Sequence, residues 1–184
     1  MQTTIAQKAR FRGVGLHSGA AVRLAILPAP ADHGIVFVRT DLDGARIPAR
    51  WDLVTPSQLC TLLDNGKGAT VSTVEHVMAA LVGTGINNAV VEVNGPEIPI
   101  LDGSSAPFVQ GILEAGLRRQ LAPLRAIRVL RPIEVRVGEG FARLSPADHL
   151  QIHFDIDFTD AAIGHQEKQL DMANGSFVYE LMDS

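Results

Sequence analysis

The order of the expected elements predicts an α+β fold, in which layers of mostly antiparallel sheet pack against helices. Three features of the order support this prediction: strand patterns open the chain, helical patterns follow in its middle, and strand patterns begin again after residue 126. Hydrophobic residues make up 46% of the 184 residues and charged residues 20%, so the chain can bury a core and is not expected to be disordered.

Short apolar runs that end in turn residues account for the strands of the first half. They predict strands at residues 22–27, 35–39 and 89–93. A further short apolar run at residues 59–63 is followed by Asp64-Asn65-Gly66, a strong hairpin signal. Residues 41–56 are rich in Asp, Gly and Pro, and we expect loop with at most short strands there.

Two helices are expected between and after these strands. Residues 72–82 carry apolar side chains at helical spacing, and Gly83 is a suitable stop. The second helix is expected to follow an N-cap at Ser104 or Ser105 and to end at Gly116, where a glycine can adopt the left-handed conformation.

The second half returns to strand patterns after a linker that contains a proline. Strands are expected at residues 127–130, 133–137, 141–144 and 150–158. In the last of these, apolar residues occupy every second position and therefore share one face. A helix begins at Ser176, but no other helix follows these strands. We therefore predict a complete first domain, a linker and the start of a truncated second domain, at residues 1–121, 122–126 and 127–184.

Charge and cysteine content narrow the class of protein. The formal net charge of −4 argues against nucleic acid as a partner, because phosphate binding favours a basic face. A single cysteine, Cys60, excludes an internal disulfide and suits a reducing compartment. The sequence shows neither a signal peptide nor a run of about 18 apolar residues, so we expect a cytoplasmic protein without a transmembrane segment.

The polar pair with the clearest chemistry lies on the first expected helix. In Ser72-Thr73-Val74-Glu75-His76, an imidazole that can bind zinc stands beside a carboxylate that can take a proton from water. Each residue also has a purely structural interpretation. Glu75 can complete a capping box with Ser72, and His76 can be a half-buried histidine bonded to a backbone carbonyl. From the pattern alone the structural interpretations are favoured, because the pair is not the His-Glu-x-x-His motif.

Other residues that could carry chemistry are more ambiguous. His17 lies in the glycine-rich segment 13–19, which lacks the Gly-Lys-Ser/Thr of a phosphate loop and could be a site or a plain loop. Asp102 could orient a metal-bound histidine or serve as a turn aspartate. Cys60 lies in an apolar run and is interpreted as a small buried residue rather than a nucleophile. Solvent exposure is expected for His149, His153 and His165.

An ordered set of motifs resembles the UDP-3-O-acyl-N-acetylglucosamine deacetylase family of lipid A biosynthesis. No single motif is decisive, but the set occurs in the family's order and spacing and covers most of the chain up to Gly116. It comprises residues 13–19 (Gly-Val-Gly-Leu-His-Ser-Gly), 39–42, 59–61, 72–76, 85–88, 96–100, 101–104 and 106–109. Residues 154–158 further resemble a strand of the family's second domain.

The resemblance implies a fold and a set of roles. The family has two similar domains that form a layered β-α-α-β sandwich, with their helices facing each other and the site between them. Glu75 matches the general base and His76 matches a ligand of the catalytic Zn²⁺. Asp102 could support the site by orienting the metal-bound histidine. The positions that match the family's substrate cleft, which receives a UDP-sugar lipid precursor, are Leu16, His17, Leu59 and Cys60.

The chain departs from the family at its end. The family's other zinc ligands, in a His-Lys-x-x-x-Asp motif, and its later catalytic histidine do not occur before Ser184. A catalytic zinc needs about three protein ligands, so the chain by itself is expected to be inactive. The first domain is expected to expose an apolar helical face that the helices of the second domain cover in the family. This exposed face would allow self-association. The alternatives are a non-catalytic binding or regulatory module that retains the first domain, the product of a degraded gene, and an unrelated α+β binding domain.

Overall fold

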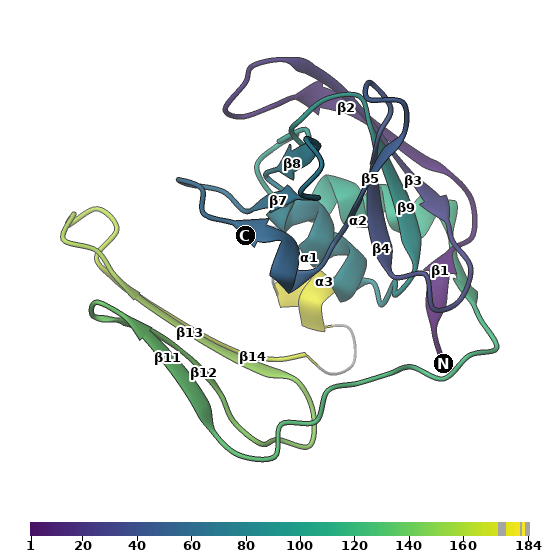
Figure 1. The fold of residues 1–184 in the computed structure, drawn as a ribbon. Coiled ribbons are helices and arrows are strands. Elements are labelled where there is room, and N and C mark those ends of the chain that lie inside the picture. The colour runs from purple at the N-terminus through teal and green to yellow at the C-terminus, as the bar shows by residue number, and fades with distance from the viewer. Residues whose placement is uncertain (173–175, 181, 183–184) are drawn as a thin grey trace. The chain divides into compact units, whose positions relative to one another are not determined.

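The computed structural model describes residues 1–172, 176–180 and 182, which divide into two compact units (Figure 1). The first unit contains Met1–Leu124 and the second contains Arg125–Glu180. The first unit combines sheets with two helices, and the strand pairs of both units are almost all antiparallel. The predicted α+β class is therefore confirmed.

A five-stranded sheet forms the main layer of the first unit. Its strands in spatial order are β2 (Ala9–Val14), β3 (Ala21–Pro28), β9 (Ala89–Val93), β4 (Ile35–Arg39) and β5 (Ala45–Pro48). Only the central β4–β9 pair is parallel. The central strands are rich in β-branched residues that alternate between two faces, and one face buries Phe37, Ile26 and Val91 completely.

Helices α1 (Glu75–Gly83) and α2 (Ala106–Ala115) cover this buried face and pack against each other (Figure 1). The rings of Phe11 on β2 and Phe108 on α2 lie 5.1 Å apart between centroids, at an angle of 54°. Tilted aromatic pairs of this kind add specific attraction to the burial of apolar area. The α2 helix follows Ser105 and ends at Gly116 with φ of 76°, as predicted.

Two smaller sheets complete the first unit. Strands β6 (Val54–Thr55), β7 (Leu62–Asp64) and β8 (Thr70–Ser72) form one, and β1 (Thr3–Ile5) pairs with β10 (Leu117–Arg119) in the other. A 3₁₀ turn, η1 (Trp51–Leu53), precedes β6. The hairpin predicted at Asp64-Asn65-Gly66 is confirmed, because β7 ends at Asp64 and residues 65–69 join it to the antiparallel strand β8. Strands β1, β2 and β10 were not predicted, since they are short or interrupted by charged residues.

The second unit consists of two antiparallel hairpins and one short helix. Strand β11 (Ile133–Val137) pairs with β12 (Gly140–Leu144), β13 (Gln151–Asp157) pairs with β14 (His165–Asp171), and α3 covers Ser176–Glu180. The predicted strand at 127–130 is wrong, since no strand forms there, and the polar strand β14 was missed. The helix predicted from Ser176 is confirmed as far as Glu180, beyond which the prediction falls largely outside the described residues.

The start of the first predicted helix is also wrong. Helix α1 begins at Glu75 instead of Ser72, and residues 70–72 belong to β8. Thr73 separates the two elements with a left-handed φ of 56°. A β-branched residue rarely adopts this conformation, so contacts from outside the segment must hold it there.

A glycine on α2 allows the close approach of helix and sheet. A Cβ atom at Gly111 would lie 2.6 Å from two ring carbons of Phe11. Alanine normally stabilises a helix by about 1 kcal/mol relative to glycine, but overpacking costs about 1–3 kcal/mol. We expect Gly111→Ala to lower the free energy of unfolding by up to about 2 kcal/mol in chemical denaturation.

The exposed neighbour Gln110 provides the control for this substitution. Gln110→Ala should change the free energy of unfolding by no more than about 0.5 kcal/mol. A Gly111→Ala protein as stable as the natural one, or more stable, would contradict the proposed contact between Phe11 and α2.

Candidate active site

Glu75 and His76 form the first turn of α1, and both are half-buried rather than enclosed by the core. The helix begins there because Thr73 interrupts β8 and Val74 then serves as the N-cap, without a side-chain cap. Residues 72–76 are here termed the β8–α1 junction. They present a carboxylate and an imidazole in consecutive residues at the N-terminus of α1.

The capping-box interpretation of Glu75 is wrong. The backbone N–H of Ser72, which the capping carboxylate would bind, donates instead to the carbonyl of Pro96 at 2.8 Å. Glu75 Oε1 accepts a hydrogen bond from the backbone N–H of Thr61. Its second oxygen, Oε2, makes no hydrogen bond with any described residue. The carboxylate is thus oriented by the loop before β7 while one oxygen remains available.

His76 also departs from its structural interpretation. Its imidazole makes no hydrogen bond to a described residue, so it is not a histidine satisfied by a backbone carbonyl. It interacts electrostatically with Asp102, which is exposed. The pKa of Asp102 lies below its usual range chiefly because the N–H of Ser104 donates to it, with the Ser104 hydroxyl and the charge of His76 adding to the effect.

Asp102 is therefore confirmed as a turn aspartate, whereas its role in orienting a metal-bound histidine stays a prediction. Its Oδ1 accepts from the backbone N–H and the hydroxyl of Ser104, both at 2.9 Å, which is the geometry of a turn aspartate at a helix entry. The interaction with His76 adds an electrostatic link to the β8–α1 junction.

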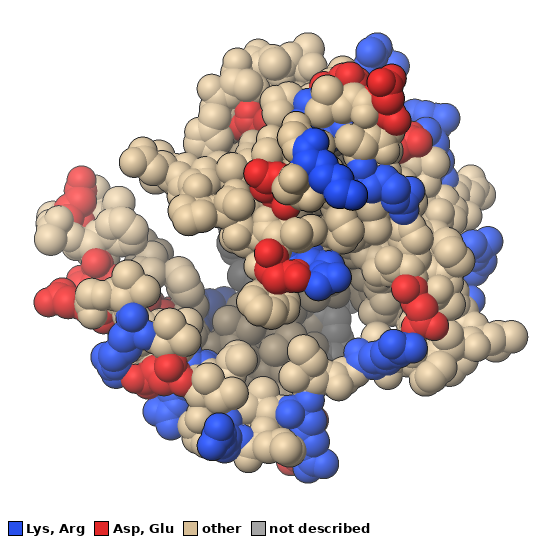
Figure 2. Space-filling view, in the orientation of Figure 1, with Lys and Arg blue, Asp and Glu red and all other residues tan. Residues whose placement is uncertain are grey.

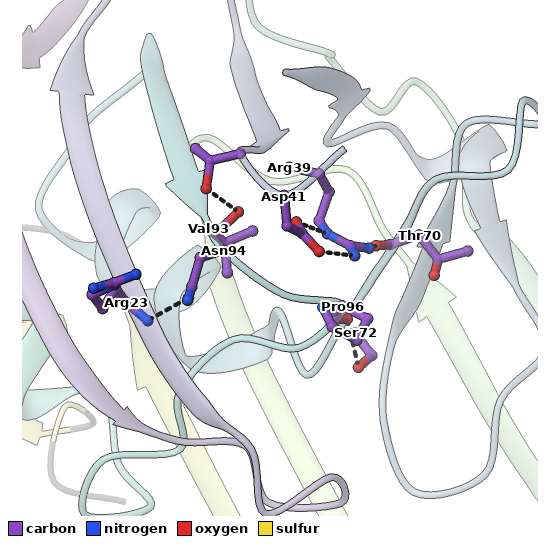
Figure 3. Close-up of polar contacts among 9 residues, drawn as sticks. Arg23, Arg39, Asp41, Thr70, Ser72, Val93, Asn94 and Pro96 are labelled. Atoms are coloured by element: carbon purple, nitrogen blue, oxygen red, sulfur yellow. Dashed lines mark hydrogen bonds and ion pairs between the residues drawn. The ribbon is translucent and has the colours of Figure 1, made fainter. Parts of the chain in front are cut away.

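A buried arginine links the five-stranded sheet to strand β8 of the three-stranded sheet (Figure 3). Arg39, at the end of β4, is 6% exposed and binds both carboxylate oxygens of Asp41, at 2.9 and 2.7 Å. Its third contact, at 2.6 Å, is the carbonyl of Thr70 on β8. This hydrogen-bonded ion pair holds the pKa of Asp41 below its usual range. Ser72 adds a bond from its hydroxyl to the Pro96 carbonyl at 3.2 Å, so β8 is held at both ends.

The predicted cleft residues lie on two loops. Leu59 is 92% exposed with a left-handed φ of 61°, and the half-buried Cys60 places its thiol 3.2 Å from the Ser57 hydroxyl. Cys60 is thus not the fully buried apolar residue that was predicted. Both residues directly precede Thr61, whose N–H binds Glu75, so the structure brings this loop to the junction.

The second loop connects β2 and β3 and carries Leu16 and His17, which are both exposed. It is linked to the junction by a residue that the sequence did not single out, Glu97. Glu97 accepts from the backbone N–H of His17 at 2.8 Å and from the hydroxyl of Thr73 at 3.2 Å. Glu97 belongs to the family-like segment 96–100, but the residues around it do not indicate this role.

Among the described residues, metal-ligating side chains gather in one place. The one group of three or more that could hold an ion is His153, Asp155 and Glu167, exposed on β13 and β14, with ligand atoms within 4.8 Å of one another. It does not include His76. The exposure predicted for His149, His153 and His165 is confirmed. His76 thus belongs to no group of three metal-ligating side chains within the described residues, and its role as a zinc ligand stays a prediction.

The surface and the helices add two further observations. On the face shown in Figure 2, Lys and Arg side chains are interspersed with Asp and Glu and form no continuous basic surface. Within the part of the chain that the structure describes, every helix is too short or too polar to cross a bilayer.

Comparison with known proteins agrees with the sequence resemblance. The family model of UDP-3-O-acyl N-acetylglycosamine deacetylase matches residues 2–184. The chain is 50% identical over 184 residues to the UDP-3-O-acyl-N-acetylglucosamine deacetylase of Phenylobacterium zucineum (strain HLK1), covering 99% of this chain and 63% of that protein. Proteins of the same name from Anaeromyxobacter sp. (strain Fw109-5) and Shewanella sp. (strain W3-18-1) are 49% and 44% identical, and the match covers 59% and 60% of their lengths. The chain therefore spans about three fifths of these relatives.

Proposed function

Since this chain belongs to the UDP-3-O-acyl-N-acetylglucosamine deacetylase family, we propose that it forms the N-terminal part of a zinc-dependent enzyme that deacetylates UDP-3-O-acyl-N-acetylglucosamine in lipid A biosynthesis. The observation that carries the proposal is the β8–α1 junction. There, Glu75 and His76 are side by side, half-buried, and not used for capping or for bonds to backbone carbonyls.

Zinc fits the donor set in part. The imidazole of His76 would supply one protein ligand, and the other ligands would come from beyond the residues of this chain. When bound, zinc supplies a Lewis acid that polarises a carbonyl and lowers the pKa of water toward about 7. Asp102, whose carboxylate interacts electrostatically with His76, would help to orient the imidazole.

Glu75 would act as the proton acceptor in amide hydrolysis. Its Oε1 is held by the Thr61 N–H, which leaves Oε2 to take a proton from the attacking water. That proton then passes to the departing nitrogen, so that acetate and a free amine are released. The exposed side chains of Leu16 and Leu59, with His17 and Cys60, would line the cleft that receives the UDP-sugar lipid precursor.

The proposal also includes the domain bounds of the chain, its cellular compartment and its self-association. We place the first domain at residues 1–121, a linker at 122–126 and the start of a second domain at 127–184. The reaction would take place in the cytoplasm, in keeping with a chain that has one cysteine. Exposed apolar residues on the helices of the first unit, Val82 on α1 and Leu113 on α2, would support self-association.

The proposal is tested in a chimera that completes the chain. This sequence is joined to the C-terminal part of the Phenylobacterium relative that it does not cover. We expect one zinc per molecule and release of acetate from UDP-3-O-acyl-N-acetylglucosamine, with zinc lost in His76→Ala. A folded chimera that lacks zinc and turnover would overturn the proposal, and binding of the UDP-sugar without turnover would instead favour a binding module.

A further inference from the structure

Glu97 is a buried carboxylate in the first unit without a cationic partner. It follows β9 and a turn, and it is 2% exposed. Its Oε1 accepts from the His17 N–H at 2.8 Å and the Thr73 hydroxyl at 3.2 Å, while Oε2 accepts from the N–H and the hydroxyl of Ser18 at 2.9 and 2.6 Å. Within the described residues no Lys or Arg side chain contacts it, so four neutral donors compensate the charge.

These donors keep Glu97 in its anionic form. Burial raises the pKa of this carboxyl, but the hydrogen bonds from His17, Ser18 and Thr73 together outweigh burial and hold its pKa below the usual range. Hydrogen bonds to the charged form have this effect because they replace the hydration that burial removes. At neutral pH the group is therefore an anion around which two separate segments are organised.

The first of these segments is the β2–β3 loop. A Cβ atom at Gly15 would collide with the Glu97 carboxylate and the Ser18 hydroxyl, so only glycine fits beside them. The backbone of Gly15 also pairs with Ala20 and Gly19 at 3.0 Å each. The loop that carries His17 is thus folded tightly against the carboxylate.

The second segment is the β8–α1 junction. Thr73 is held in its left-handed conformation by its hydroxyl bond to Glu97 and by its N–H bond to the Thr61 carbonyl at 3.1 Å. Such a conformation is strained for a β-branched residue and persists only where the surroundings fix it. Thr73 lies two residues before Glu75, and its turn sets where α1 begins.

We propose that Glu97 is a positioning residue whose anionic carboxylate couples the His17 loop to the Glu75–His76 pair. Its effect on catalysis rests on the proposed function, but the coupling is a property of this chain and can be measured in it alone. Through Thr73 the carboxylate fixes the start of α1, and through His17 and Ser18 it fixes the β2–β3 loop.

Glutamine cannot replace this carboxylate. Each oxygen of Glu97 accepts two hydrogen bonds, whereas a glutamine amide would turn its NH₂ group toward backbone or hydroxyl donors. In either orientation of the amide, a backbone N–H of His17 or Ser18 would lose its acceptor. A buried donor without a partner is costly, and the loop is expected to open locally.

The test follows amide hydrogen exchange in the 184-residue chain. Glu97→Gln should speed exchange about tenfold at residues 15–18 and also at 72–76, while the core of α2 keeps its protection. The matched control is Glu92→Gln, which changes a half-buried glutamate on β9 that pairs with Lys8. Faster exchange confined to residues 15–18 would overturn the coupling. It would show that Glu97 stabilises the β2–β3 loop alone.

A second variant covers the case in which Glu97→Gln does not fold. Thr73→Val keeps the side-chain shape, leaves the carboxylate in place and removes only the hydroxyl. We expect exchange at residues 15–18 to rise although no loop residue is changed, and Thr73→Ser to restore protection. Unchanged exchange at 15–18 in Thr73→Val would contradict the proposal.

A kinetic measurement in the chimera separates positioning from folding. Glu97→Gln should lower kcat by about 10²-fold with little change in zinc content or KM, because a small displacement of Glu75 is enough. A kcat equal to that of Glu92→Gln would overturn the catalytic part of the proposal. An inactive unsubstituted chimera would refute the proposed function, while the exchange data would still decide the coupling.

Discussion

Glu75→Gln in the completed enzyme is expected to lower kcat by about 10²–10⁴-fold while zinc content and the free energy of unfolding stay close to those of the unsubstituted protein. Glutamine retains an oxygen that can accept the Thr61 N–H, so the side chain keeps its orientation. It cannot take up a proton from water, and this is the step that the carboxylate is proposed to perform.

A purely structural Glu75 would give the opposite result. Loss of a helix cap costs about 1 kcal/mol of stability and leaves the rate per folded molecule nearly intact. Because the N–H of Ser72 is already bound to Pro96, a capping role is not available to Glu75 in this fold. Steady-state kinetics, zinc analysis and thermal unfolding of the same preparations distinguish the two cases. Gln110→Ala, on the exposed face of α2, serves as the matched control, and a loss of less than about tenfold in kcat for Glu75→Gln would contradict the general-base role.

The 184-residue chain by itself is expected to release no acetate from UDP-3-O-acyl-N-acetylglucosamine above the uncatalysed rate. Its candidate site offers one histidine, whereas a catalytic zinc normally has three protein ligands and water. One imidazole binds zinc too weakly to hold it through purification. The measurement is acetate release at enzyme concentrations that make the chimera's turnover easily detectable.

Zinc binding by the isolated chain has to be assigned before it is interpreted. The exposed group of His153, Asp155 and Glu167 can take up the ion weakly, independently of His76. His153→Ala removes this group, and His76→Ala removes the candidate site. Turnover by the purified chain that disappears in Glu75→Gln would show that its own residues suffice, and would refute the expected inactivity.

Local patterns in the sequence were enough to determine much of the fold. The strict alternation in residues 150–158 predicts β13, because a strand repeats every two residues whatever its partner is. Ser105 and Gly116 bound α2, since N-cap and C-cap geometry depends on a few neighbouring residues. The ordered motifs likewise identified the family and directed attention to Glu75 and His76.

The tertiary structure decided what depends on partners distant in sequence. Helix α1 begins at Glu75 because Ser72 pairs with Pro96 and Thr73 is held by Glu97, contacts that span about 24 residues. Helical periodicity contains no information on such bonds, so the start of α1 was predicted three residues too early. The polar strand β14 likewise forms only because β13 pairs with it. Periodicity and caps are set by neighbours along the chain, whereas the acceptor that orients each backbone N–H of the candidate site comes from another segment.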